Sequence, residues 1–374
     1  MGWNHTDLTN AAGAPKAFTA PCAYAFEAQG TQHVLHVGDD NHIYELRWDN
    51  TGWHHCDLTN ETGAPALPGD SKVNKPCGYV FTAQSTQHVN FVPGDCHVHE
   101  LWADSTGWHH NDLTSSAGAP LAVAQPPCAY VFDGQSTQHV DYLGQDGHIH
   151  ELWWDTDGWH HNDLTNETGS PLAAIATPTG YVFAAQGTQH VDYVGQDGHI
   201  HELWWDSEGW HHNDLTTRTG APLAAVGNPV GYVFAAQGSQ HIDYLGQDHD
   251  IHELSWDSNG WLHNDLTEES GAAPAQAVLC AYVFDGQGTR HVVYAAEDGD
   301  VHELWWNLDG WHYNDLTTET DAPPADLGDP AGYVFVAQGT QHVDYIGIED
   351  SHIHELRWQS STTPIRPVPP KDPI

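Results

Sequence analysis

A Gly-Trp pair recurs along the chain at nearly equal intervals, and this repetition constrains the fold more than any other feature. The copies start near residues 2, 52, 107, 158, 209, 260 and 310 of the 374-residue chain, and the second copy carries an insertion around residues 68–76. Repeats of roughly 20–50 residues usually stack into one architecture. The sequence therefore predicts one repeated domain, although length alone would suggest two or three.

Each copy divides into four segments that are typical of β-strands. Between residues 180 and 216 they read GYVFAAQ, TQHVDYVG, HIHELWWD and GWHHNDLT. The second and third segments alternate polar and apolar residues, which is the period of a strand. Turn-forming stretches rich in Gly, Asp and Pro separate the segments. Four short antiparallel strands in each of seven copies predict an all-β fold, a seven-bladed β-propeller.

The two ends of the repeated region complement each other. The chain starts with a segment of the fourth type, GWNHTDLT, and the last copy ends with a segment of the third type, HIHELRWQS. Joining them completes the seventh blade and closes the ring, which removes an exposed sheet edge. We expect the propeller over residues 1–361. The Pro-rich residues 362–374 are expected to form an extended tail or a linker.

The charge of the chain excludes several classes of partner. There are 51 Asp and Glu residues against 9 Lys and Arg, a net charge of −42 with neutral histidines. Such a surface repels phosphate backbones, so nucleic acid is not expected as a ligand. No apolar segment approaches the ~20 residues of a membrane-spanning helix, so membrane insertion is not expected either. The first copy already begins at residue 2, so no signal peptide is expected in this sequence.

Several aromatic and turn residues of the unit are expected to be structural. Trp204 and its copies are predicted to pack between blades, and Tyr181, Val182 and Phe183 are predicted to lie in the core. The triplet DLT at 214–216 occurs in every copy. It is expected to form a structural corner in which Asp or Thr oxygens accept hydrogen bonds from turn amides.

A histidine and a glutamate also recur in every copy, as His190 and Glu202 do in the fourth. The turn between the second and third segments decides whether they meet. A two-residue loop would place His190 opposite Trp205 and leave Glu202 on the other face. A three-residue loop with Gly198 in the left-handed conformation would place Asp192 opposite Glu202, with His190 diagonal on the same face. We favour the second arrangement, which permits either a structural hydrogen bond between strands or the polar half of a binding site.

The spacing His190, Glu202, Trp205 and Trp210 resembles the repeat of the fungal fucose-specific lectins, which are β-propellers of the Aleuria type. In that family an arginine precedes the glutamate by twelve residues, and an aromatic residue and a tryptophan follow it. Arginine and glutamate bind sugar hydroxyls, and the aromatic rings cover the apolar face of the sugar between neighbouring blades. The resemblance extends over residues 2–358.

The resemblance implies a non-catalytic lectin that binds fucose or a related monosaccharide in repeated pockets between blades. Its partners would be glycans or glycoconjugates, it would need no cofactor or metal, and it would be a monomer or a small homo-oligomer. A lectin of this kind favours an extracellular or secreted location, which the sequence itself leaves open. Carried over copy by copy, the predicted sugar-binding residues are His33, Glu45, Trp48 and Trp53; His88, Glu100 and Trp108, with Ala103 in place of the aromatic; His139, Glu151, Trp154 and Trp159; His190, Glu202, Trp205 and Trp210; His241, Glu253, Trp256 and Trp261; His291, Glu303, Trp306 and Trp311; and His342, Glu355 and Trp358, with Trp3 supplied from the N-terminus.

Two departures from the family pattern bear on specificity. The arginine of the family is histidine in every copy, and an imidazole cannot make the forked contact of a guanidinium. The spacing therefore does not by itself imply fucose. The fungal lectins also have six blades, whereas the sequence predicts seven here, so seven-bladed bacterial propeller lectins are a second resemblance.

An enzyme is not expected, because catalysis usually needs one asymmetric constellation with distinct acid and base roles. Here the same histidine and glutamate occur in every copy, and no nucleophile motif is present.

Divalent-metal binding is an alternative function. His199 and His201 lie two residues apart with His211 and His212 nearby, and imidazole-rich sites suit Zn, Cu or Ni. The pair is broken in three copies, by Tyr44, Asp250 and Asp300, which argues against a dedicated site. A protein–protein interaction scaffold is the other alternative.

Overall fold

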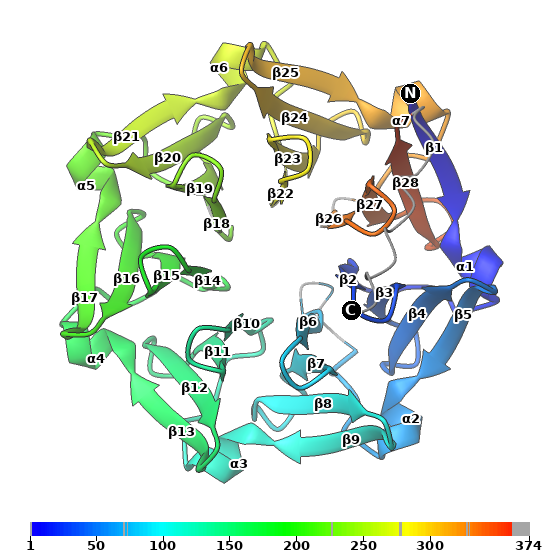
Figure 1. The fold of residues 1–374 in the computed structure, drawn as a ribbon, viewed down its shortest axis with the longest axis horizontal. Coiled ribbons are helices and arrows are strands. Elements are labelled where there is room, and N and C mark those ends of the chain that lie inside the picture. The colour runs from blue at the N-terminus through cyan, green and yellow to red at the C-terminus, as the bar shows by residue number, and fades with distance from the viewer. Residues whose placement is uncertain are drawn as a thin grey trace, which may run out of the picture.

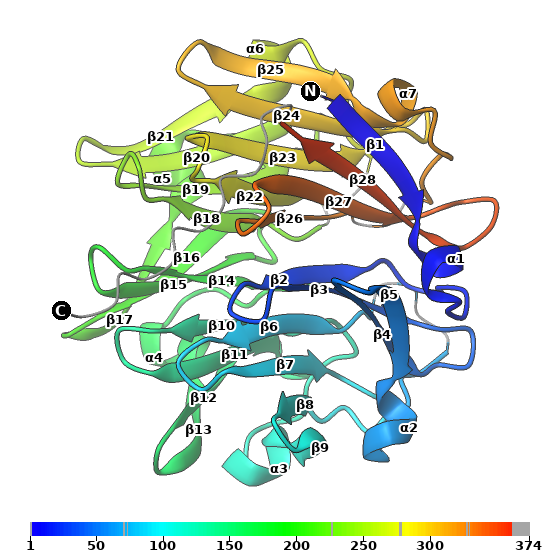
Figure 2. The same ribbon diagram turned by 45° about the vertical axis from the view of Figure 1, so that its right-hand side comes forward.

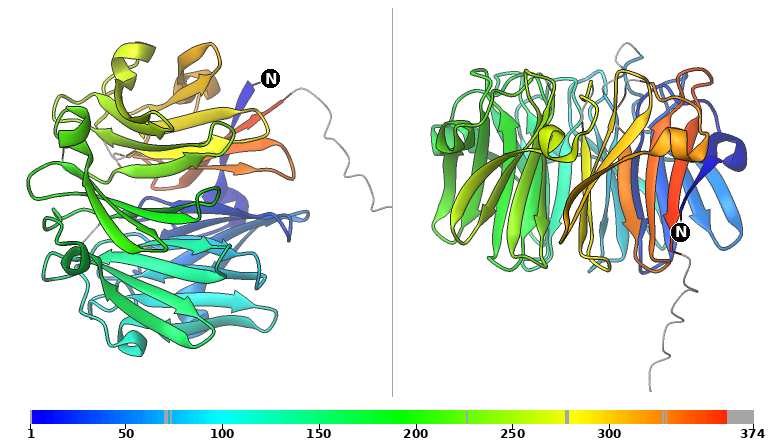
Figure 3. Two further views of the ribbon diagram at one scale, coloured as in Figure 1. Left: turned by 60° about the vertical axis from the view of Figure 1, so that its left-hand side comes forward. Right: turned by 90° about the horizontal axis from the view of Figure 1, so that it is seen from above.

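The computed structural model describes residues 2–360 except 70, 71, 73, 226, 277, 278, 327 and 329, so the tail expected at 362–374 lies outside the described residues. Seven four-stranded antiparallel sheets surround a central axis (Figure 1). Within each sheet the first strand lies innermost and the fourth outermost. Seen from the side, the molecule is a disc whose strands run roughly along its axis (Figure 3). The predicted seven-bladed β-propeller is confirmed.

Each blade takes its four strands from one stretch of chain, except blade 7. Blade 1 consists of β2 (Cys22–Phe26), β3 (Thr31–Val37), β4 (Ile43–Asp49) and β5 (Gly52–Asp57). Blade 2 consists of β6 (Cys77–Phe81), β7 (Thr86–Phe91), β8 (His99–Asp104) and β9 (Gly107–Asp112). Blade 3 consists of β10 (Cys128–Phe132), β11 (Thr137–Leu143), β12 (Ile149–Asp155) and β13 (Gly158–Asp163). Blade 4 consists of β14 (Thr179–Phe183), β15 (Thr188–Val194), β16 (Ile200–Asp206) and β17 (Gly209–Asp214).

The remaining blades follow the same order. Blade 5 consists of β18 (Val230–Phe234), β19 (Ser239–Leu245), β20 (Ile251–Asp257) and β21 (Gly260–Asp265). Blade 6 consists of β22 (Cys280–Phe284), β23 (Thr289–Ala295), β24 (Val301–Asn307) and β25 (Gly310–Asp315). Blade 7 consists of β26 (Ala331–Phe335), β27 (Thr340–Ile346), β28 (Ile353–Gln359) and the N-terminal β1 (Gly2–Asp7).

Strand β1 closes the ring, as the sequence predicts. It pairs with β28 along its whole length, from Gly2 opposite Gln359 to Asp7 opposite His354. Figure 2 shows the two strands side by side. The carboxylate of Asp7 also lies 2.9 Å from Nδ1 of His352, which adds a side-chain contact at the closure. Blade 7 therefore has the same four strands as the others.

The DLT triplet forms a corner at the outer rim. Asp214 caps a single helical turn by accepting a hydrogen bond from the backbone N–H of Thr217 at 2.8 Å. Oγ1 of Thr216 accepts one from the backbone N–H of Ile200 at 2.9 Å, which ties the corner to the third strand. These contacts confirm the predicted corner and explain why both residue types recur.

The corner is nevertheless helical, which the sequence pattern does not indicate. A five-residue helix follows the fourth strand of every blade: α1 (Leu8–Ala12), α2 (Leu58–Thr62), α3 (Leu113–Ala117), α4 (Leu164–Thr168), α5 (Leu215–Thr219), α6 (Leu266–Ser270) and α7 (Leu316–Thr320). One turn is too short to display a period of 3.6 residues. None of the helices in the described part of the chain is long and apolar enough to cross a membrane.

The core lies between neighbouring blades. Val191, Tyr193 and Leu203 of blade 4 form one cluster with Leu143 and Ile149 of blade 3, and comparable clusters fill the other boundaries. Each blade therefore buries its apolar face against the next blade around the ring. This packing explains why the unit is stable only when repeated.

The predicted core residues are only partly confirmed. Tyr181 and Phe183 are buried, whereas Val182, on the opposite face of β14, is half-buried. Trp204 is half-buried as well, and its ring stacks on His211 with 4.2 Å between centroids. Trp204 therefore packs at the edge of a blade boundary and is not part of the buried core.

Candidate functional site

The turn between the second and third strands sets which residues share a face. Gly198 has a φ of 79°, and the register places Asp192 opposite Glu202 and His190 opposite Trp204. This confirms the three-residue loop. A residue with positive φ occupies the same place in all blades, including Asn41, Cys96 and His249, where the side chain makes this conformation less favourable.

The predicted histidine and glutamate of one repeat do meet. Nδ1 of His190 lies 2.9 Å from Oε1 of Glu202, and Nε2 of the same ring lies 2.8 Å from Oγ1 of Thr188. Nδ2 of Asn213, on the fourth strand, donates to Oε2 of Glu202 at 2.7 Å. The histidine–glutamate contact recurs in all seven blades at 2.7–2.9 Å.

The paired side chains are buried. In every blade both are at most 5% exposed. Tyr181 stacks on the ring of His190 at 5.2 Å and covers it from the first strand. Of the two interpretations that the sequence left open, the contacts support the structural one, because the pair ties the second strand to the third.

The face that carries His190 and Glu202 is turned toward blade 5. Nε2 of Gln240, from blade 5, donates to Oε1 of Glu202 at 2.8 Å. Trp256 of blade 5 packs edge-on against Phe183, with 6.3 Å between centroids. The glutamate of one blade is therefore enclosed by residues of the next.

The four predicted residues of one repeat do not line one pocket. Trp205 lies three residues after Glu202 on the same strand, and side chains of a strand alternate between faces. Trp205 pairs with Trp210 on the opposite face, which is turned toward blade 3.

Each boundary instead combines the histidine and glutamate of one blade with the tryptophans of the next. The combinations are His33 and Glu45 with Trp108; His88 and Glu100 with Trp154 and Trp159; His139 and Glu151 with Trp205 and Trp210; His190 and Glu202 with Trp256 and Trp261; His241 and Glu253 with Trp306 and Trp311; His291 and Glu303 with Trp358 and Trp3; and His342 and Glu355 with Trp48 and Trp53.

A tryptophan–histidine stack fills most of these boundaries near the disc surface. In blades 2, 3, 4 and 6 the ring centroids lie 4.1–4.3 Å apart. Blades 1 and 7 have Arg47 and Arg357 in place of the tryptophan. Blade 5 has Ser255 paired with Leu262, two smaller side chains.

The small side chains of blade 5 leave an open cavity of about 400 Å³ at its boundary with blade 6. Its polar lining includes Glu253, Asn264 and Arg290, and Ser255 lies where other blades have a large side chain. The other lining residues are Gln237, Ser239, His241, Trp256, Asp257 and Leu262. This boundary thus brings polar and aromatic groups together around empty space.

Arg290 is a site residue that the sequence analysis missed. It replaces the glutamine found in the other six copies, and its guanidinium donates to Oε1 of Glu253 across the boundary. Its Nη1 also lies 2.6 Å from Nδ1 of His241. The guanidinium carbon lies 5.0 Å from the ring centroids of both Trp306 and Trp311, within the range of a cation–π interaction.

The charge of Arg290 controls the ionisation of its partner. Burial alone would raise the pKa of Glu253, but the charge of Arg290 and the contact with His241 outweigh it and lower this pKa to about 2. Glu253 is therefore a carboxylate at neutral pH, held next to a guanidinium. The signal for this pair was present in the sequence as TRHV, where the other copies read TQHV or SQHI.

Comparison with known proteins identifies the family. The sequence model described as fungal fucose-specific lectin matches residues 1–227, more than half of the chain. The chain belongs to this family. The resemblance seen in the repeat is confirmed, and membership identifies a carbohydrate-binding protein. A comparison with curated protein sequences found no match.

Solved lectin structures share the architecture at low sequence identity. The BP39L lectin from Burkholderia pseudomallei is 15% identical with a TM-score of 0.70, over 93% of this chain and 99% of that one. The SapL1 lectin, solved with alpha methyl fucoside, is 18% identical with a TM-score of 0.52, over 80% and 96%. The six-bladed Aleuria aurantia lectin is 13% identical with a TM-score of 0.50, over 80% and 96%. At these identities the likeness concerns the fold.

Proposed function

We propose that the protein is a non-catalytic lectin whose principal sugar site is the cavity between blades 5 and 6. The pairing of Arg290 with Glu253 carries this proposal. In the fungal lectin family arginine and glutamate bind sugar hydroxyls, and the spacing within one repeat offers histidine instead of arginine. At this boundary the following blade supplies the arginine, so the pair is present after all.

The cavity has the size and the groups for a monosaccharide. Pockets for small molecules are roughly 300–1,000 Å³ in volume, and this one is about 400 Å³. A guanidinium donates and a carboxylate accepts, so together they match neighbouring hydroxyls of a sugar ring. Leu262 adds apolar surface to the lining. Fucose is the first candidate because of the family.

The other six boundaries have glutamine in place of Arg290, which supports a lesser role in binding. As in blade 5, their histidines and glutamates are buried and bonded to each other, but no arginine joins the pair. The tryptophans are half-buried and remain within reach of a ligand. We propose that the polar pairs there shape the walls, and that any sugar contacts come from the tryptophans.

The symmetry of the molecule supports a binding rather than a catalytic role. The same histidine–glutamate contact repeats in all seven blades. Both nitrogens of His190 have protein partners, so neither is poised to exchange a proton with a substrate. Several binding sites on one ring would instead gain avidity for a glycan-coated surface.

A glycan array followed by calorimetry tests the proposal. The array, read at neutral and mildly acidic pH, should show binding to fucosylated glycans. In calorimetry with L-fucose, Arg290→Gln should weaken binding at least ~10-fold, which corresponds to about 1.4 kcal/mol. Ser255→Trp should abolish binding, because it places in blade 5 the side chain that fills other boundaries.

The matched control is Trp204→Ser, which makes the reverse change in blade 4 and should leave fucose binding intact. Binding to no glycan on the array would overturn the lectin proposal. Wild-type affinity in both Arg290→Gln and Ser255→Trp would show that the site lies at another boundary.

A further inference from the structure

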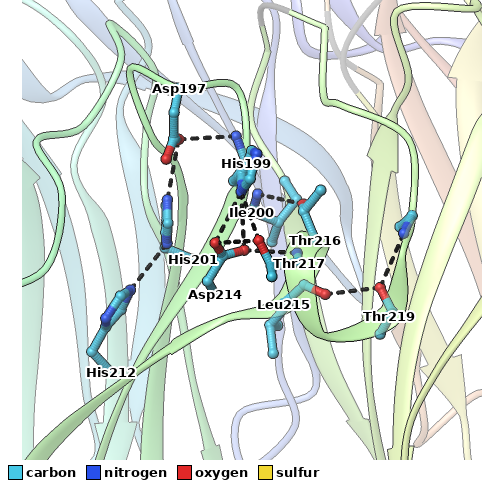
Figure 4. Close-up of polar contacts among 11 residues, drawn as sticks. Asp197, His199, Ile200, His201, His212, Asp214, Leu215, Thr216, Thr217 and Thr219 are labelled. Carbon is cyan, nitrogen blue, oxygen red and sulfur yellow. Dashed lines mark hydrogen bonds and ion pairs between the residues drawn. The ribbon is translucent and has the colours of Figure 1, made fainter.

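A second polar cluster repeats at the opposite end of the strands from the sugar cavity, near the turn between the second and third strands. Figure 4 shows it in blade 4. Nε2 of His201 lies 3.2 Å from Oδ1 of Asp197, and Nδ1 of the same ring lies 3.0 Å from Nε2 of His212. Nδ1 of His199 lies 2.9 Å from Oδ2 of Asp214. Three imidazoles and two carboxylates therefore gather on one side of the blade.

The cluster of blade 2 is more compact. One ligand atom each from His97, His99 and Asp112 lies within 4.8 Å of the others. Nε2 of His110 lies 2.9 Å from Nδ1 of His99 and adds a fourth candidate ligand. We propose that blade 2 binds a divalent transition-metal ion, with Zn²⁺ as the best match, through His97, His99, His110 and Asp112.

The ligand set suits zinc. Zinc prefers tetrahedral sites built from imidazole nitrogens, thiolates and carboxylate oxygens. Two nitrogens bound at ~2.0–2.1 Å to one tetrahedral zinc lie ~3.3 Å apart. The nitrogens of His99 and His110 are 2.9 Å apart, and Nδ1 of His97 is 2.9 Å from Oδ2 of Asp112. Each of these two pairs needs to separate by only a few tenths of an ångström. The atoms of His97, His99 and Asp112 lie within 4.8 Å of one another, so the two pairs must also move together to share one ion.

A neighbouring carboxylate orients the most buried ligand. Oδ2 of Asp95 lies 3.2 Å from Nε2 of His99 and accepts a hydrogen bond from it. This bond keeps the proton on Nε2 and leaves the lone pair of Nδ1 directed into the cluster. Histidines that ligate metals commonly donate their other N–H to a carboxylate in this way.

The site is open to solvent, and only one oxygen of its carboxylate is used by the backbone cap of the helix. The side chains of His97 and Asp112 are 28% and 31% exposed, so an ion can enter from the rim. Oδ1 of Asp112 accepts the capping hydrogen bond from the backbone N–H of Ser115 at 2.9 Å. Oδ2 lies 2.9 Å from Nδ1 of His97 and accepts a hydrogen bond from Oγ of Ser115 at 2.7 Å. An ion bound to Oδ2 would compete with this hydroxyl, but the backbone cap on Oδ1 could remain.

Blades 3, 4 and 7 repeat the complete set. Their ligands would be His148, His150, His161 and Asp163; His199, His201, His212 and Asp214; and His352, His354, His5 and Asp7. Blades 1, 5 and 6 replace one or more of the histidines. In blade 1 the second histidine is Tyr44, whose hydroxyl donates to Asp40. The substitutions at Tyr44, Asp250 and Asp300, which argue against metal binding in the sequence, therefore affect only blades 1, 5 and 6.

Calorimetric titration of the full chain with Zn²⁺ tests the proposal. Excess Mg²⁺, which prefers oxygen ligands, should be present to occupy the many surface carboxylates. One equivalent of zinc is expected for each of the four blades with the complete set, blades 2, 3, 4 and 7. His97→Ala should remove one equivalent. The matched control is His42→Ala in blade 1, which should change nothing because Tyr44 interrupts that set.

Circular dichroism and thermal unfolding should show that both variants fold. His97 is sufficiently exposed for alanine to be tolerated. The proposal would be overturned if Mg²⁺ suppressed all zinc binding, or if His97→Ala and His42→Ala bound the same amount as the wild type. Because none of these residues lines the sugar cavity, loss of zinc binding leaves the lectin proposal intact, and the reverse also holds.

Discussion

Arg290 of blade 6 lies against Glu253 of blade 5, and its guanidinium carbon lies 5.0 Å from the ring centroids of both Trp306 and Trp311. The side chain of Arg290 is only 5% exposed, so an ion pair is buried at one boundary of an otherwise repetitive ring. At the boundary between blades 4 and 5 an uncharged donor, Gln240, takes the place of the arginine and contacts Glu202. The two arrangements can be compared within one molecule.

Removing the arginine should destabilise the ring more than replacing it with glutamine. Arg290→Ala leaves Glu253 buried with only His241 and Asn264 as partners, and breaking a buried ion pair in this way costs about 3–5 kcal/mol. Arg290→Gln recreates the glutamine–glutamate contact that Gln240 makes with Glu202 and should cost clearly less. Denaturant unfolding at pH 7 measures both. Equal losses would mean that the charge pair is not what the boundary requires.

Glu202 should be essential to the stability of blade 4. Its carboxylate accepts from Asn213 and Gln240 and contacts His190. Glu202→Ala leaves these buried groups without an acceptor, at about 1–3 kcal/mol for each group left unpaired. We expect the midpoint of urea unfolding to fall accordingly. The exposed Glu208→Ala should stay within ±0.5 kcal/mol of the wild type, as surface substitutions usually do.

His36 should make stability fall in acid. Blade 1 reverses the usual order of rings, with His36 stacked on Tyr44 where blade 4 has Tyr193 on His201. Burial lowers the pKa of His36 to about 4, against about 6.5 in an unfolded chain. The unfolded chain therefore takes up a proton first. The contribution of His36 to stability is complete above about pH 6.5 and is lost as the pH falls toward 4.

Phenylalanine, which occupies this position in blade 2 as Phe91, removes the titration. In His36→Phe the free energy of unfolding should depend less on pH between 6.5 and 4.5, by up to about 1.4 kcal/mol per pH unit. Urea unfolding at several pH values measures the slope. His54→Gln in the same blade, where the side chain is 54% exposed, should keep the slope of the wild type. Identical slopes in all three proteins would show that His36 does not titrate between the two states.

Deleting residues 2–7 should open the ring. Strand β28 would lose its partner and present an unpaired edge, which promotes association. Light scattering after size-exclusion chromatography should show oligomers or aggregates. A synthetic peptide covering β1, added to the truncated chain, should restore the elution volume of the intact protein. A truncated chain that stays unassociated without the peptide would contradict this role of β1.

Much of the fold could be predicted because repetition and turn chemistry act locally. The register at Gly198 followed from one left-handed residue, and it holds even where Asn41, Cys96 or His249 must adopt that conformation. The five-residue helices could not be predicted, because one turn carries no periodic signal. Val182 is less buried than predicted because it lies on the innermost strand and on the face opposite to Tyr181 and Phe183.

The site was predicted less well, and for a different reason. Residues three apart on a strand lie on opposite faces, so Glu202 and Trp205 could not share a pocket. The family spacing within one repeat covers residues that belong to two different blade boundaries. Only the packing of the blades shows which histidine and glutamate meet which tryptophans. Arg290 and Ser255 depart from the pattern in single copies. In a repeat protein, such single-copy exceptions make one boundary chemically different from the others.

Ring closure by β1 also has a consequence for how the protein is made. Strand β1 is synthesised long before its partner β28, and the contact between Asp7 and His352 spans 345 positions. Contacts so distant in sequence form late, because a long loop must close before they are gained. Six blades can assemble as they are synthesised, but the seventh cannot be completed until β28 has been made. A chain that stops before β28 therefore leaves β1 without its partner strand and the ring open.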